Sequence, residues 1–168
     1  MALVTEDGTG LPTAESYLSV ADADTYWSNR GNAVWAAADT ADKEVALRKA
    51  TQYLDTTFIW IGVLADTAQA LNWPRSGADD AEGRNLVNEV PVLVKNATAE
   101  LALAALSAEL LVTTSRDDRA KRVKAGSVEV EFEAGVSSQK SYTLAERMLA
   151  PLVVGRYGGG AVIGLQLS

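Results

Sequence analysis

Residues 91–112 read PVLVKNATAELALAALSAELLV, and this stretch decides the fold class. Pro91 suits the first position of a helix, because proline has no amide hydrogen that would be left unpaired there. One apolar face is formed by Val94, Leu101, Ala105 and Ala108, which Leu103, Leu106 and Leu110 widen. The pattern predicts a helix from Pro91 to about Val112 that is buried on more than one side, against its own core and against a second subunit.

Shorter helices are predicted before and after this stretch. Ser19 precedes Val20-Ala21-Asp22, a capping-box variant that predicts a helix from about Val20 to Asn29. A second helix is expected over 41–55, capped by Asp39 or Thr40. A last one is expected over 144–149, capped by Thr143.

The strongest strand signal lies near residues 122–133. Val128, Val130 and Phe132 alternate there with glutamates, which is typical of a β-strand with one apolar and one polar face. We expect it to form half of a hairpin with residues 123–125. The stretch 66–89, rich in Asp, Asn and Gly, is expected to be a long surface loop.

These elements predict a mainly α protein: a small helical bundle with a β-hairpin or short strand pair and extended N- and C-terminal arms. A chain of 168 residues is long enough for one domain with its own core. We expect a single domain over 1–168. Its parts are an extended arm over 1–18, a helical core over 19–151 with the β element near 122–133, and a flexible arm over 152–168.

The composition argues against catalysis. The chain has no histidine and no cysteine, which removes the commonest general base, thiolate chemistry and most transition-metal ligand sets. We therefore expect no catalytic residue, no metal and no cofactor. No signal peptide and no apolar run long enough for a membrane span are present, so no membrane partner is expected.

Charge argues against tight binding to nucleic acid. The net charge is −7, so the field of the whole molecule repels a polyanion. A single basic cluster stands out, and Asp117 and Asp118 interrupt it: Arg116, Arg119, Lys121, Arg122 and Lys124. It is a weak candidate for nucleic-acid contact, and a solvated loop or an interface to an acidic neighbour is the favoured interpretation.

Two further motifs are candidates for binding. Most tryptophans stand beside aliphatic residues and are expected to pack in the core or at an interface, but the turn Trp73-Pro74-Arg75 is expected to project toward a partner. The strand residues Val128, Val130 and Phe132 form a second candidate interface, because an edge strand can pair with a neighbouring copy. The acidic group Asp79, Asp80 and Glu82 lacks the spacing of a calcium loop and is interpreted as solvated.

Several ordered segments together resemble known phage proteins. They are Leu3–Gly10, Ser16-Tyr17, Ala21–Tyr26, Ala46–Asp55, Ala70–Gly77 and Val90-Pro91. Over nearly the whole chain, and least after about residue 140, they resemble a phage family labelled DnaT-like single-stranded DNA-binding protein. The Trp-Pro-Arg loop followed by an alanine-rich helix also resembles the head–tail connector adaptors of long-tailed phages.

The two resemblances imply different functions. The adaptor resemblance implies a virion structural protein, made in the host cytoplasm and placed in the neck as a ring, a dodecamer by analogy. Its partners would be further copies of itself, the portal protein, the next neck or tail-completion protein, and packaged DNA that passes through the lumen without specific binding. The other implies a phage-encoded single-stranded DNA-binding replication accessory protein.

Net charge favours the adaptor interpretation, because an acidic ring lets DNA slide. In that interpretation the C-terminal arm docks on the portal through Arg156, Tyr157, Val162, Ile163, Leu165 and Leu167.

Overall fold

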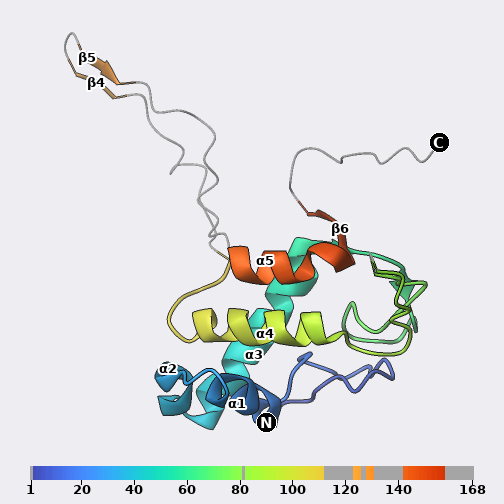
Figure 1. Ribbon diagram of the computed structural model, residues 1–168. Helices are drawn as coiled ribbons and strands as arrows, with labels where there is room; N and C mark the ends of the chain where they lie inside the picture. The colour runs from blue at the N-terminus through green and yellow to red at the C-terminus, as the bar shows by residue number, and fades with distance from the viewer. Residues whose placement is uncertain (1, 81, 112–122, 126–127, 131–141, 158–168) are drawn as a thin grey trace. The chain divides into compact units, whose positions relative to one another are not determined.

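A computed structural model describes residues 2–80, 82–111, 123–125, 128–130 and 142–157 (Figure 1). Within them the protein is mainly α, with short antiparallel strand pairs, as predicted. Where one domain was expected, the chain divides into two compact units. One unit, called the body below, comprises Met1–Leu110 and Tyr142–Ser168, and the other comprises Leu111–Ser141.

The first three helices begin at side-chain caps. Helix α1 (Val20–Ser28) follows Ser19, α2 (Ala33–Ala37) follows Asn32, and α3 (Thr40–Thr57) follows Asp39. Each cap side chain accepts the backbone N–H three residues on, at 2.8–3.1 Å, which satisfies a donor that the helix leaves unpaired. The cap at Ser19 was predicted, and Asp39 is one of the two caps that were expected for α3.

The core lies between α3, α4 (Val92–Ala105) and α5 (Thr143–Leu149). Figure 1 shows α5 along α4, with α3 crossing both. On α4 the fully buried side chains include three alanines, whose small size lets neighbouring helices approach closely: Val94, Ala97, Thr98, Ala99, Leu101 and Ala102. The chain itself therefore covers the wide apolar face of α4, and this face needs no second subunit.

Helix α4 is shorter than predicted, because it ends at Ala105 and not near Val112. The amides of Ser107 and Ala108 both donate to the carbonyl of Ala104, at 3.2 Å, which tightens the last turn. After this turn the Leu110 side chain is buried in the core. The apolar pattern thus continues past the end of α4 because Leu110, which follows the turn, also packs into the core.

The C-terminal arm begins later than expected. Strand β6 (Val153–Arg156) pairs antiparallel with β1 (Phe58–Trp60), and Leu152, at the end of a 3₁₀ turn (Ala150–Leu152), is fully buried. The prediction of a flexible arm from residue 152 is therefore wrong for 152–156. The arm residues Val162, Ile163, Leu165 and Leu167 lie outside the described residues.

The N-terminal segment has no helix before Val20, as expected, but it is part of the body and is not a free arm. The buried Glu6 carboxylate accepts the amides of Gly8, Gly10 and Leu11, each at 2.9 Å. A parallel bridge joins Thr5 to Ser16. The segment is thus held by its own hydrogen bonds.

The predicted hairpin is confirmed in the second unit. Strands β4 (Val123–Ala125) and β5 (Val128–Val130) pair antiparallel, with Lys124 opposite Glu129. Phe132 lies outside the described residues. In the body, β2 (Val63–Leu64) pairs with β3 (Arg75–Ser76).

The cap predicted at Thr143 is wrong, because Thr143 is the first residue of α5 and its N-cap, Tyr142, makes no side-chain cap bond. None of the described helices combines the length and the apolarity needed to cross a membrane.

Candidate nucleic-acid interface

Charge is divided unevenly between the two units. Residues 111–141 contain six basic and five acidic residues, whereas the rest of the chain contains nine basic and seventeen acidic ones. The predicted basic cluster belongs entirely to the smaller unit. Arg116, Arg119, Lys121 and Arg122 lie outside the described residues, and Lys124 lies in β4.

Most basic side chains of the body are already paired with carboxylates. The pairs are Lys43–Asp24, Arg48–Glu15, Lys49–Glu109, Arg84–Asp80 and Arg156–Glu146, with nitrogen–oxygen distances of 2.5–2.9 Å. A phosphate would have to compete with these carboxylates. Most cationic side chains of the body are therefore already engaged in ion pairs within the body.

The tryptophans do not offer stacking platforms. All four are buried, and the Trp35 indole donates to Asp24 at 2.8 Å. Core or interface packing was predicted for the others, but the expected exposure of Trp73 is wrong. Its ring is 0% exposed and packs edge-on against Trp60, with ring centroids 5.9 Å apart.

The turn that contains Trp73 is anchored from inside. The Arg75 guanidinium donates to the carbonyls of Ile61 (2.6 Å), Gly62 (2.8 Å) and Asn72 (3.0 Å). These bonds point the side chain inward, where sequence reasoning expected it to project outward. An interface role for Trp73-Pro74-Arg75 stays a prediction, and the fully buried ring cannot supply its surface.

A polar network joins the same turn to α3 and to the N-terminal segment. The Tyr17 hydroxyl donates to the Asp55 carboxylate and accepts the Trp73 amide at 3.2 Å. Asp55 also accepts the Asn72 amide at 3.1 Å. Burial raises the pKa of Asp55 to about 6, and burial together with the Asp55 charge raises the pKa of Tyr17. The network connects three segments far apart in the sequence, which is a structural role.

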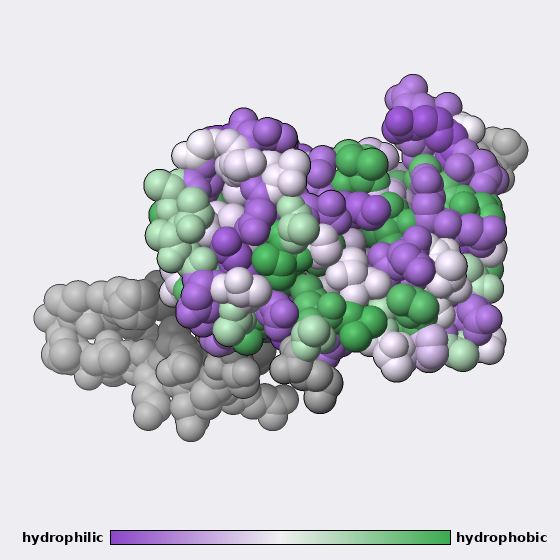
Figure 2. All heavy atoms as spheres, turned by 90° about the horizontal axis from the view of Figure 1, so that it is seen from below, coloured by the Kyte–Doolittle hydropathy of each residue, from purple (hydrophilic) through white to green (hydrophobic). Residues whose placement is uncertain are grey.

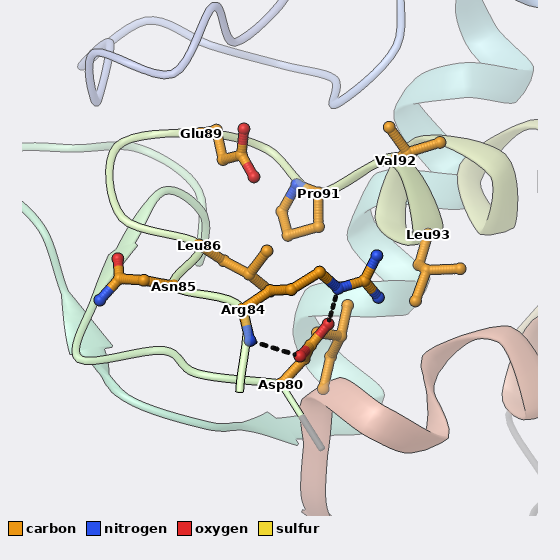
Figure 3. Close-up of a pocket in the computed structure, with 9 residues that line it drawn as sticks. Asp80, Arg84, Asn85, Leu86, Glu89, Pro91, Val92 and Leu93 are labelled. Atoms are coloured by element: carbon orange, nitrogen blue, oxygen red, sulfur yellow. Dashed lines mark hydrogen bonds and ion pairs between the residues drawn. The ribbon is translucent and has the colours of Figure 1, made fainter. Parts of the chain in front are cut away.

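A pocket of about 270 Å³ lies beside the start of α4 (Figure 3). Arg84 extends across it, and Leu86, Leu93 and Leu152 are among the apolar side chains that line it. The sequence was interpreted as placing Asp80 in a solvated loop, but its side chain is buried. Its carboxylate accepts hydrogen bonds from the Arg84 amide (2.9 Å) and from the Arg84 Nε (2.6 Å). These bonds hold the pKa of Asp80 below its usual value.

The acidic loop residues form no ligand cluster. Within the described residues no group of three or more acidic side chains is placed to hold a metal ion.

One aromatic ring of the body is exposed. Tyr157 follows β6 and is 62% exposed, and its amide donates to the Thr57 carbonyl at 2.9 Å. Arg156 precedes it, and Arg147 is exposed on α5. Sequence reasoning assigned Arg156 and Tyr157 to a docking arm and missed Arg147. The available signal was the spacing, since Arg147 lies three residues after Leu144 and therefore on the same face of the predicted helix.

The described surface has no large apolar face in the view of Figure 2. Apolar side chains occur there in small groups separated by polar ones. Scattered exposed valines such as Val34 and Val45 are ordinary for a protein surface. Self-association of the chain stays a prediction.

Comparison with known proteins identifies one family. A family model described as "Putative DnaT-like ssDNA binding protein" matches residues 1–166. No curated protein and no solved structure matches the chain.

This match corrects the functional prediction. The interpretation as a virion head–tail adaptor in the neck is contradicted, because the family that covers the chain is described by single-stranded DNA binding. The reason for the error is physical: a net charge of −7 averages two units whose charge balances differ.

Proposed function

The chain belongs to the family of DnaT-like single-stranded DNA-binding proteins, and from this premise we propose that it binds single-stranded DNA through the phosphate backbone. The match over residues 1–166 is the observation that carries the proposal. The function corresponds to an accessory protein of replication, and the chain needs no catalytic residue for it.

The main contact is the basic stretch from Arg116 to Lys124. It contains five basic residues within nine positions, in the unit whose charge is close to balanced. The body supports this assignment by elimination, because its ion pairs occupy most of its cations. A local positive segment is what a polyanion needs when the whole-molecule field repels it.

Binding of this kind depends strongly on salt and weakly on base sequence. Phosphate contacts carry no sequence information, so the stretch alone selects no particular base. Each contact to a single strand contributes about −0.7 to the slope of log affinity against log salt. Five contacts therefore predict a slope of about −3.5.

The test is fluorescence anisotropy with a labelled single-stranded oligonucleotide over a range of salt concentrations. The triple variant Arg119→Ala, Lys121→Ala, Arg122→Ala should bind about 100-fold more weakly at 0.1 M salt, because it loses three contacts of about 0.7 log unit each. A matched control removes three cations from the body: Arg30→Ala, Lys49→Ala and Lys95→Ala. The control should lose less than about threefold, since only the general field changes.

Two results would contradict the proposal. One is the absence of binding by the wild-type protein at low salt. The other is an equal loss of affinity in the triple variant and in its control, because net charge alone would then explain the binding.

A further inference from the structure

The end of β6 holds an aromatic ring in a fixed and open position. The amide of Tyr157 is bonded to Thr57, the last residue of α3, and the strand before it is paired with β1. The ring itself is 62% exposed and has no ring partner among the described residues. An anchored backbone with an exposed ring loses little entropy when a flat partner covers that ring.

The other aromatic side chains of the described body are committed elsewhere. The tryptophans, Tyr17, Tyr26, Tyr53 and Phe58 are buried, and Tyr142 packs edge-on against Tyr53 at 5.3 Å. Within the part of the chain that the structure describes, Tyr157 is therefore the aromatic ring that a nucleobase can reach.

Cationic side chains lie on β6 and α5, the two elements that the Arg156–Glu146 ion pair joins beside this ring. Arg156 precedes it, and its side chain is 42% exposed and lies over the Phe58 ring with its guanidinium carbon 4.9 Å from the centroid. Arg147 is exposed on α5, and no ion pair of Arg147 is found among the described residues.

We propose that Tyr157 stacks on a base of single-stranded DNA while Arg156 and Arg147 bind the neighbouring phosphates. The proposal rests on the proposed function and adds a second contact, on the body, to the basic stretch 116–124. Exposed aromatic rings beside cations are the usual elements of sequence-tolerant single-strand binding, because every base has a flat face.

This contact accounts for a preference for single strands over duplex. Phosphate contacts exist in both forms of DNA, so the basic stretch attracts either. A base in a duplex is already stacked on its neighbours and cannot cover the tyrosine ring without unpairing. Selectivity therefore comes from Tyr157, whereas affinity comes mainly from the basic stretch.

Glu146 sets the strength of the phosphate contact. Its carboxylate holds the Arg156 guanidinium at 2.8 Å and accepts the Tyr142 amide at 3.1 Å. A phosphate must compete with this carboxylate for Arg156. Glu146→Gln keeps an acceptor for the amide but removes the competing charge, so it should tighten single-strand binding by about threefold.

The experiment compares a single-stranded oligonucleotide with its duplex in fluorescence anisotropy, using the full chain. Tyr157→Ala should weaken single-strand binding by about 5- to 100-fold and leave duplex binding unchanged. Tyr157→Phe should bind as the wild type, because stacking needs the ring and not the hydroxyl. Arg147→Ala should lower the salt slope by about 0.7.

A photochemical readout locates the contact directly. Oligonucleotides that carry 5-iodouracil should cross-link to Tyr157, as identified by mass spectrometry of the peptides. Unchanged single-strand affinity in Tyr157→Ala, beside a lost affinity in the Arg119, Lys121 and Arg122 triple variant, overturns this inference and leaves the proposed function intact. A wild-type protein that binds no single-stranded DNA overturns both.

Discussion

The body and the unit of residues 111–141 differ in what holds them and in what they carry. The body is a helical core in which most basic side chains are paired with carboxylates. The smaller unit has a hairpin as its described element and contains the basic stretch from Arg116 to Lys124. The difference teaches that a net charge describes neither unit. We propose that stability comes from the body, whereas most of the affinity for single-stranded DNA comes from the smaller unit.

The largest expected effect concerns the body alone. Trp73→Ala removes a fully buried ring and should lower the free energy of unfolding by about 3–5 kcal/mol, because it leaves a cavity beside Trp60. Chemical denaturation followed by circular dichroism measures this loss. The matched control is Tyr157→Ala, an exposed aromatic, which should change stability by less than about 0.5 kcal/mol. Similar stability of the two variants would refute the placement of Trp73 in the core.

A smaller effect tests the polar network of the body through pH. Burial raises the pKa of Asp55 to about 6 in the folded protein, above its ordinary value of 3.8. The folded state therefore binds more protons than the unfolded state between these values, so this contribution is complete below about pH 4 and is lost as pH rises through about 6.

Asp55→Asn provides the comparison, because asparagine does not titrate. Unfolding free energies measured between pH 4 and pH 7 should fall with pH in the wild type more steeply than in the variant. Parallel curves for the two proteins would show that Asp55 does not titrate as its burial requires.

Local signals predicted much of the body. The caps at Ser19 and Asp39 were predictable because a cap bonds to residues three positions away. The hairpin over 123–130 was predictable because alternation is a local pattern and its partner strand lies close in sequence. These elements require no knowledge of distant segments.

The parts that sequence reasoning missed depend on distant partners. Strand β6 is defined by its pairing with β1, almost a hundred residues earlier, and the glycines after it suggested a flexible arm. Trp73 is buried because remote carbonyls of Ile61 and Gly62 hold the neighbouring Arg75 inward. No local pattern around Trp73 distinguishes that arrangement from an exposed turn.

The candidate site was predicted only in part. The five basic residues from Arg116 to Lys124 were identified from the sequence, but the negative charge of the whole chain argued against a contact of these residues with nucleic acid. Because the chain divides into two units, the charge of their own unit is the relevant one for these five residues. Electrostatic attraction acts over a screening distance of about 10 Å at 0.1 M salt.

Replacement of residues 111–141 by a short Gly-Ser linker tests the separation of stability from DNA binding most directly. The measurement is the affinity of the shortened chain for a single-stranded oligonucleotide at 0.1 M salt, taken beside its thermal unfolding curve. We predict that the body melts within a few degrees of the wild type and that the affinity is at least about 100-fold weaker. Tyr157→Ala in the shortened chain should then remove the binding that remains. An intact body that binds single-stranded DNA with wild-type affinity would contradict the account.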